Sequence, residues 1–152
     1  MTPYRFGIVA ARFNAEITGR LLDRCVRTLK ASGVPATSIV TVRVPGSYEI
    51  PWAASELARS GRFDALICLG AILRGRTTQN DHIAASTFHH LHAVSIATRV
   101  PCILGIITPN TYGQALARTR GRLDRGREAA LAALEMAELS RRLRPRRSRP
   151  AR

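Results

Sequence analysis

One segment combines a turn that could bind an anion with side chains that could also hold that anion. In residues 69–83, LGAILRGRTTQNDHI, an apolar stretch runs into Arg76 and Thr77 and then into a helical pattern. A turn between a buried strand and a helix leaves backbone N–H groups free, and the helix dipole favours negative charge there. Guanidinium and hydroxyl groups add donors. The segment predicts a phosphate site, although it also fits an ordinary connection with Thr77 or Thr78 as N-cap.

Two further loops carry residues that suit a planar, hydroxylated ligand. ARFN places Phe13 after an apolar run, where its ring could stack on a heterocycle. VPGSYEIP presents Ser47, Tyr48 and Glu49 on a Pro-Gly turn, whose free amides and carboxylate suit a polyhydroxyl chain. Taken singly, Phe13 also fits a hydrophobic staple and Glu49 a first-turn helix charge.

Strand and helix patterns alternate along the chain. Four apolar runs rich in Val and Ile have strand length: 4–10, 38–44, 63–72 and 101–108. Helical spacing of apolar residues covers 17–29, 50–57, 83–94 and 112–118, and a long helix through Leu131, Leu134 and Leu139 closes the chain. This order predicts an α/β fold, a three-layer αβα sandwich around a four-stranded parallel sheet. Its ligands are expected beyond the carboxyl ends of the strands, where the three loops meet.

Composition predicts one domain and a basic tail. A chain of 152 residues with 45% hydrophobic content fits a single domain, which we place at residues 1–140. Residues 141–152, RRLRPRRSRPAR, hold seven arginines and supply half of the net charge of +14. We expect this tail to be disordered, and any contact with nucleic acid to be made through it.

Cysteine usage and hydropathy indicate the compartment. Cys25, Cys68 and Cys102 are far apart in apolar contexts, so we expect buried thiols rather than disulfides or a metal site. His89, His90 and His92 also lack the acidic or cysteine partner that a metal site would need, so we read them as packing or interface residues. No apolar run reaches membrane-spanning length and no signal-peptide pattern is present, so we expect a cytoplasmic protein without membrane contact.

Five ordered motifs resemble the lumazine synthase family. They are ARFN, VPGSYEIP, LGAILRGRTT, GIITPNTYGQALAR and DRGREAALAALEM, and they span roughly residues 5–142. The resemblance implies a flavodoxin-like, homo-oligomeric enzyme of riboflavin biosynthesis. Its two small-molecule substrates would be 5-amino-6-ribitylaminouracil and 3,4-dihydroxy-2-butanone 4-phosphate, with no cofactor or metal. It also implies a pentamer, or a higher assembly of pentamers, with sites between adjacent subunits.

The same resemblance assigns roles residue by residue. It implies that Phe13 stacks on the pyrimidine ring, that Ser47, Tyr48 and Glu49 hold the ribityl chain, and that Ala71, Ile72 and Leu73 line the pyrimidine pocket. Arg76 and Thr77 would receive the phosphate, and Arg118 would reach it from the neighbouring subunit. A bidentate guanidinium suits that contact.

Several positions depart from the family pattern. Gln79 stands where most members have the histidine that transfers protons, and an amide cannot exchange a proton near neutral pH. His82 lies one helical turn further and could substitute, or it could be an ordinary surface or core histidine. Leu104 replaces an aromatic residue near the ring. Arg76 replaces an acidic or small residue, and Arg125 replaces a lysine, so both favour phosphate.

Loss of one proton-transfer group leaves three interpretations open. Holding two reactive substrates together can supply much of the acceleration, so a slower enzyme is the first expectation. A lumazine synthase-like paralogue that binds lumazine or flavin without making it is the second. A shell-forming scaffold whose tail recruits acidic cargo or RNA is the third.

Overall fold

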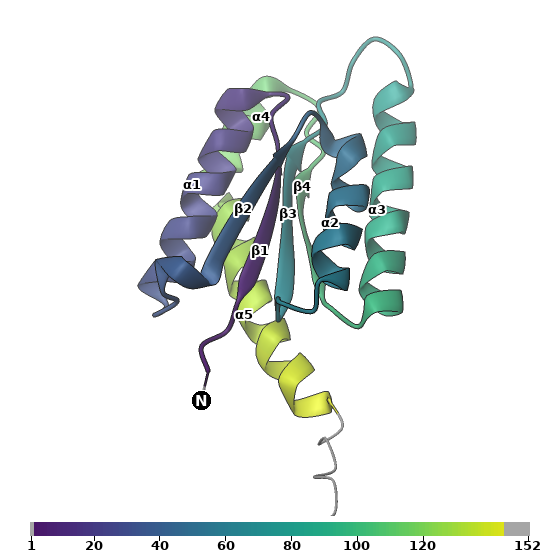
Figure 1. The fold of residues 1–152 in the computed structure, drawn as a ribbon. Coiled ribbons are helices and arrows are strands. Elements are labelled where there is room, and N and C mark those ends of the chain that lie inside the picture. The colour runs from purple at the N-terminus through teal and green to yellow at the C-terminus, as the bar shows by residue number, and fades with distance from the viewer. Residues whose placement is uncertain (1, 145–152) are drawn as a thin grey trace, which may run out of the picture.

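A four-stranded parallel sheet forms the centre of the protein, as the sequence predicted. The computed structural model describes residues 2–144, and the sheet has the order β2-β1-β3-β4 (Figure 1). Its strands are β1 (Phe6–Ala11), β2 (Ile39–Val44), β3 (Ala65–Ala71) and β4 (Cys102–Ile107). Every residue of β1 and β3 is buried, whereas β2 up to Arg43 and the first three residues of β4 are partly or fully exposed. The fully buried strands therefore occupy the centre of the sheet and the more exposed strands its edges.

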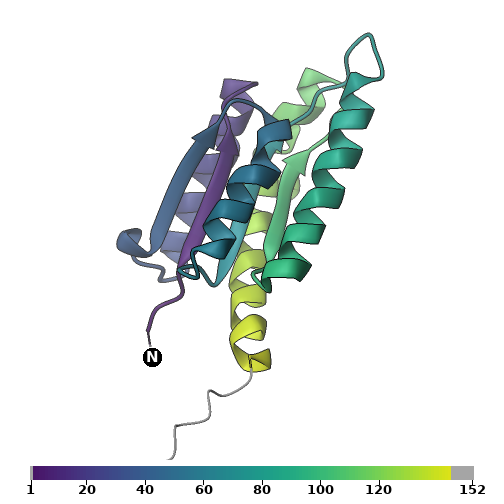
Figure 2. The same cartoon turned by 45° about the vertical axis from the view of Figure 1, so that its right-hand side comes forward.

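Helices cover both faces, which completes the predicted three layers. α2 (Ile50–Arg59) and α3 (Gln79–Thr98) lie on one face, and α1 (Ala15–Ala31), α4 (Tyr112–Ala117) and α5 (Arg125–Leu143) lie on the other (Figures 1 and 2). Three 3₁₀ turns that the sequence analysis did not anticipate fill connections: η1 (Ala36–Ser38), η2 (Ser47–Glu49) and η3 (Gly121–Leu123). No helix in residues 2–144 is long and apolar enough to cross a membrane.

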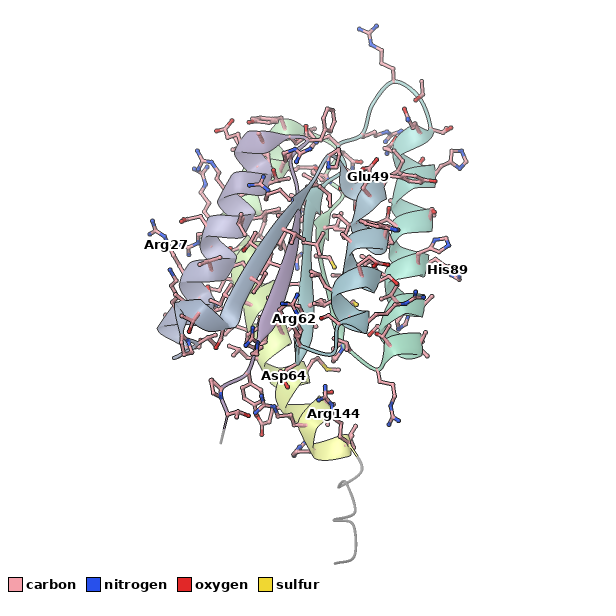
Figure 3. All side chains as sticks on the ribbon, viewed as in Figure 1. Arg27, Glu49, Arg62, Asp64, His89 and Arg144 are labelled. Atoms are coloured by element: carbon pink, nitrogen blue, oxygen red, sulfur yellow. The ribbon has the colours of Figure 1, made fainter. Side chains whose placement is uncertain are left out.

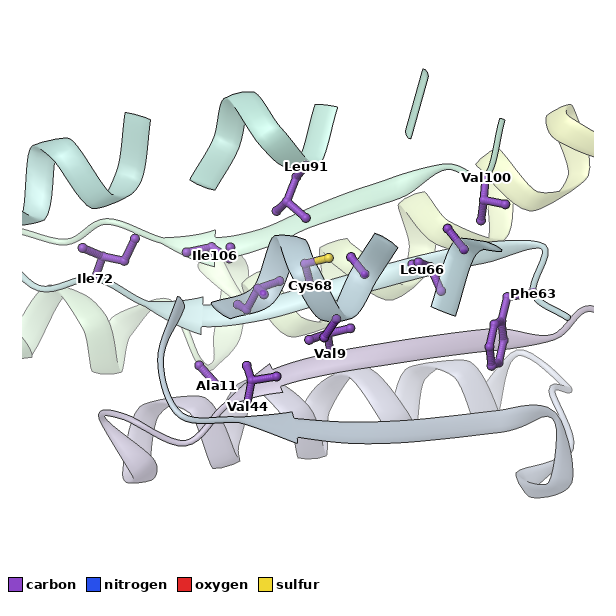
Figure 4. Close-up of a cluster of buried hydrophobic side chains, with 14 residues drawn as sticks. Val9, Ala11, Val44, Phe63, Leu66, Cys68, Ile72, Leu91, Val100 and Ile106 are labelled. Atoms are coloured by element: carbon purple, nitrogen blue, oxygen red, sulfur yellow. The ribbon is translucent and has the colours of Figure 1, made fainter. Parts of the chain in front are cut away.

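Two hydrophobic clusters hold the layers together. Between the sheet and α2 and α3, side chains such as Val9, Leu66 and Ile106 interdigitate (Figure 4). On the other face, α5 presents buried alanines and approaches α1 so closely that a Cβ on Gly126 would lie 2.4 Å from the Leu21 carbonyl oxygen. Small residues along α5 are what allow this close contact between the two helices.

The three thiols are free; Cys25 and Cys68 are buried as the sequence predicted, whereas Cys102 is only partly buried. Burial raises the pKa of both Cys25 and Cys102 to about 12, and it also raises the pKa of Cys68. All three therefore stay protonated near neutral pH, so they are poor nucleophiles and poor metal ligands. Among residues 2–144, no three His, Cys, Asp or Glu side chains are grouped as a metal site.

The last helix continues past the boundary expected at residue 140. α5 runs to Leu143, and Arg141 donates from Nε and Nη2 to the two carboxylate oxygens of Asp64, both at 2.8 Å. Arg141 also donates to the carbonyl oxygens of Thr2 and Pro3 and lies over the Tyr4 ring. The expectation that the tail begins at Arg141 is therefore wrong, because this arginine ties α5 to the start of β3. Residues 145–152 lie outside the described part.

The ionisation of the Asp64 carboxyl group depends on its contact with Arg141. Burial alone would raise its pKa, but hydrogen bonds from Arg141 and from the Arg5 amide outweigh burial and hold the pKa of Asp64 below its ordinary value. A carboxyl group with a lowered folded-state pKa stabilises the fold above its unfolded-state pKa, and the contribution is lost as the pH falls through the folded-state pKa.

Arg141→Ala is expected to lower the free energy of unfolding by about 2–3 kcal/mol at pH 7, somewhat below the cost of breaking a fully buried pair. The loss should shrink as the pH falls below about 4, where Asp64 becomes protonated in the unfolded chain. Urea denaturation of the parent and the variant across this range measures both effects. Arg142→Ala is the control, since Arg142 is exposed; equal losses for the two variants would contradict the assignment.

Candidate functional site

A cavity of about 630 Å³ opens at the carboxyl ends of the central strands. Its walls come from the β1–α1 loop, η2, the segment after β3 and the first turns of α3. The lining residues are Phe13, Asn14, Ser47, Tyr48, Glu49, Ala71, Ile72, Leu73, Gly75, Thr77, Gln79, Asn80 and Ile83. The structure thus gathers the three loops that the sequence picked out.

Phe13 presents its ring to solvent at the mouth of this cavity. The Arg12 and Phe13 amides donate to the carbonyl oxygens of Val44 and Pro45 at 2.8 and 2.9 Å, which extends the pairing of β1 with β2 beyond the strands. The Phe13 side chain is 72% exposed. A hydrophobic staple is therefore excluded, and the ring is free to stack on a planar ligand.

The second loop combines a tightly held serine with an exposed tyrosine. Ser47 is buried, and a Cβ on Gly70 would lie 2.4 Å from its Oγ, so glycine in β3 makes room for the hydroxyl. Tyr48 is 65% exposed. Glu49 lies at the same edge of the sheet (Figure 3), where one of its oxygens accepts from the Gly46 amide at 3.0 Å. The expectation of free amides is therefore wrong for Gly46, and Glu49 both stabilises its turn and faces the cavity.

The connection from β3 to α3 rises above the sheet (Figure 1). Ala71 and Ile72 form buried walls of the cavity, and Gly75 and Thr77 also line it. Arg76 is exposed and is not among the lining residues, so within one chain it does not share the cavity with Thr77. Thr78 occupies the N-cap position of α3 without a side-chain capping bond.

Gln79 and His82 occupy different positions relative to the cavity. Gln79, the first residue of α3, lines it and also lines an adjoining cavity of about 490 Å³. His82 is exposed and lines only the adjoining cavity. The position of Gln79 is therefore the one from which a proton-transfer group would reach a ligand lying against Phe13. The two cavities share the lining residues Tyr48, Thr77, Gln79 and Ile83, and His82 is not among them.

A second cavity, of about 410 Å³, lies along the open edge of β4. Leu104, Arg118 and Arg125 line it, and Leu104 is 52% exposed. The Arg125 amide donates to the Arg118 carbonyl oxygen at 2.8 Å, so the two arginines are held side by side. Arg125 also forms an ion pair with Glu128, while Arg118 Nη1 donates to the Gln114 carbonyl oxygen at 3.1 Å. Two guanidinium groups in one cavity suit an anion.

One ionisable pair, which lines none of the cavities described above, is unsuited to proton transfer. The Tyr112 hydroxyl of α4 donates to the Glu16 carboxylate of α1. This hydrogen bond lowers the pKa of Glu16 and raises that of Tyr112. Near neutral pH the carboxylate therefore stays ionised and the phenol stays neutral, so their role is to join α1 to α4.

Sequence reasoning did not single out Asn14 as a site residue. Its side-chain amide Nδ2 donates to the Ala71 carbonyl oxygen at 2.8 Å, which joins two walls of the first cavity. The ARFN motif contains Asn14. However, a contact to a residue 57 positions away has no local sequence signal.

The sheet order, the helices on both faces and the cavity at the carboxyl edge define a flavodoxin-like α/β protein with a ligand site where such folds place it. The model of the 6,7-dimethyl-8-ribityllumazine synthase family matches residues 3–141. The 6,7-dimethyl-8-ribityllumazine synthase of Microcystis aeruginosa is 44% identical over 146 residues, which cover 93% of this chain and 81% of that protein.

Two further relatives carry the same name. The protein of Salinibacter ruber is 43% identical, over 90% of this chain and 88% of its own length. The chloroplastic protein of Arabidopsis thaliana is 44% identical, over 89% of this chain and 60% of its own length. The chain belongs to the 6,7-dimethyl-8-ribityllumazine synthase family.

Proposed function

We propose that this protein is a transferase of riboflavin biosynthesis that condenses 5-amino-6-ribitylaminouracil with 3,4-dihydroxy-2-butanone 4-phosphate to form 6,7-dimethyl-8-ribityllumazine. Family membership supports this activity. The structural observation that supports this activity for this chain is the cavity lined by exposed Phe13 together with Ser47 and Glu49. An aromatic ring beside a carboxylate and a hydroxyl suits a planar heterocycle that bears a polyhydroxyl chain.

In this proposal, the two substrates occupy the cavity from opposite sides. The pyrimidine stacks on Phe13 against Ala71, Ile72 and Leu73, and its ribityl hydroxyls bind the Ser47–Glu49 turn. The four-carbon phosphate lies by Thr77 and the exposed Arg76. The substrate amine attacks the ketone and water leaves as the imine forms; phosphate elimination, ring closure and dehydration complete the product. Holding both substrates together supplies much of the acceleration.

We further propose that the complete site is made by two copies of the chain. The cavity with Phe13 and the cavity with Arg118 share no lining residue, yet the proposal assigns the phosphate to Arg118 as well as to Thr77 and Arg76. In such a site the Arg118 surface of one copy would contact the Phe13 surface of the next copy. Because these two surfaces differ, the arrangement is head-to-tail, and it closes into a ring. A homo-pentamer, alone or in a larger assembly, is the ring that the family resemblance implies.

Two surface features support such an assembly. Leu104 is exposed beside the arginines at the open edge of β4. α3 carries one charged side chain, Asp81, in its 20 residues, and its outward side holds His89 (Figure 3) and Ile96, which is 71% exposed. A weakly charged helix on a chain with a net charge of +14 is a surface where copies can approach with little repulsion.

The test of the proposed function is direct. Purified protein is mixed with both substrates, and formation of the lumazine is followed by its absorbance and by phosphate release. Product above the uncatalysed rate is the expected result. Binding of the lumazine without turnover would favour the paralogue, which the glutamine at position 79 supports as a second candidate. A protein that neither binds nor forms it, and that co-purifies with nucleic acid, would favour a scaffold.

Arg118→Ala is expected to raise the Michaelis constant for the phosphate substrate at least several-fold, because a charge-assisted contact contributes about 1.5–3 kcal/mol. The Michaelis constant for the pyrimidine should change little. Steady-state kinetics with each substrate varied in turn measures both constants. Arg122→Ala, a nearby exposed arginine that does not line the cavity, is the control. Equal effects on both substrates would overturn the assignment.

Two broader expectations complete the proposal. A cytoplasmic location agrees with three free thiols, which a reducing compartment preserves. Any contact with nucleic acid stays assigned to the basic C-terminal residues, most of which lie outside the described part.

A further inference from the structure

Asn14 adopts a backbone conformation that few residues other than glycine take. Its φ of 58° and ψ of 54° lie in the left-handed region, which in residues 2–144 it shares with only one other non-glycine residue, Arg99. Asparagine tolerates this region better than most residues. As the N-cap of α1, its carbonyl oxygen accepts from the Thr18 amide at 3.0 Å. Its side chain makes no capping bond, so it is available for another contact.

The contact made by the Asn14 side chain takes the place of a backbone hydrogen bond between β1 and β3. The Ile72 amide donates to Ile107 in the β4 direction, so the Ala71 carbonyl of the same planar peptide points towards β1. The pairing of β1 with β3 ends at Ala10 and Leu69, because residues 12 and 13 pair with the β2 side instead. The Asn14 side chain donates to the Ala71 oxygen at 2.8 Å and so takes the place of the missing strand partner.

We infer that Asn14 is a positioning residue that sets the distance between the Phe13 ring and the Ala71–Leu73 wall. The Phe13 ring is largely exposed and so has little packing of its own to fix it. Its loop is joined to β2 through the Arg12 and Phe13 amides, and to the opposite wall of the cavity through Asn14. A planar ligand between ring and wall needs this spacing to be held. This inference rests on the proposed function for the identity of that ligand.

Asn14→Gly isolates the side-chain contact, because glycine adopts the left-handed backbone without strain while it lacks the amide. We expect a thermal midpoint a few degrees below the parent's, since the Ala71 carbonyl loses its partner, and a dissociation constant for 6,7-dimethyl-8-ribityllumazine, titrated by its fluorescence, that rises about three- to tenfold. The Michaelis constant for the phosphate substrate should stay within about twofold. Arg99→Gly is the matched control: it makes the same change at the other left-handed position, at the C-cap of α3, and should leave lumazine binding unchanged.

A second comparison tests whether Asn14 acts through Phe13. In a Phe13→Ala background the ring is gone, so adding Asn14→Gly should weaken lumazine binding little further. Asn14→Asp keeps a residue tolerant of the backbone but replaces the donor with an oxygen that faces the Ala71 carbonyl, and it should weaken binding at least as much as glycine does. Additive losses, or an Asn14→Gly protein that binds like the parent, would overturn the inference. If the parent itself neither binds nor forms lumazine, the proposed function fails instead.

Discussion

Gln79→His is expected to raise the turnover number by up to the 10²–10⁴-fold that a general acid or base typically contributes, with little change in substrate affinity. Gln79 lines the cavity beside Phe13 and Ala71, so an imidazole at this position would reach the reacting atoms. The amide present now can hydrogen-bond the substrate but cannot exchange a proton. Steady-state rates from pH 6 to 8 measure the gain.

Two control variants separate the alternatives for proton transfer. Gln79→Leu removes the amide without adding an imidazole, and should lower turnover modestly if the amide only binds substrate. His82→Ala should change turnover little, since His82 lines only the adjoining cavity. A large loss in His82→Ala, together with no gain in Gln79→His, would mean that His82 has taken over the role.

Mixing two impaired variants is expected to restore activity when both substrates are well below their Michaelis constants. Phe13→Ala weakens the ring site and Arg118→Ala weakens phosphate binding, so each variant alone is slow under these conditions; the two residues lie in separate cavities of one chain. After dissociation and random reassembly of equal amounts, about a quarter of the contacts in a head-to-tail ring would join two intact halves. The recovered rate should therefore approach a quarter of the parent's. A site made within one chain predicts no recovery.

The mixing experiment needs proof that subunits exchange. A fluorescent label on each variant, followed by energy transfer after reassembly, reports exchange independently of activity. Each variant carried alone through the same treatment should keep its own low rate. Exchange without recovery would contradict a site shared between copies, whereas recovery before exchange would indicate contamination by parent protein.

The periodicity of apolar residues predicted the architecture, because the residues that a strand or helix buries recur at that element's own spacing. The apolar run at 63–72 contains β3 and the run at 4–10 covers all of β1 but Ala11; every residue of both strands is buried, and the ends of the runs differ from the structure by only one or two residues. Arg141 shows where composition misleads. Its arginine-rich neighbourhood resembles a solvated tail, but its contact with Asp64 spans 77 residues, and no local pattern encodes that distance.

The sequence predicted the residues of the candidate site better than it predicted how they are divided between cavities. The sequence correctly placed Phe13, Ser47 and Gln79 at the carboxyl edge of the sheet, because the carboxyl ends of parallel strands meet there. The separation of Arg118 and Leu104 into a second cavity follows from β4 being an edge strand, which the order of elements along the chain does not state. The use of the Gly46 amide by Glu49 is likewise a matter of three-dimensional geometry.

The Arg141 contact has a consequence for how the chain can be re-engineered. Arg141 Nη1 lies 2.8 Å from the Thr2 carbonyl oxygen, so the first residues and the end of α5 are neighbours at the amino-terminal edge of the sheet, away from the ligand cavity. Chains whose ends lie close together tolerate circular permutation. A short linker that joins Leu143 to Thr2 in place of residues 145–152, with new termini opened in the exposed turn at residues 31–33, would change the connectivity while leaving every strand, and the cavity at the opposite edge, in place.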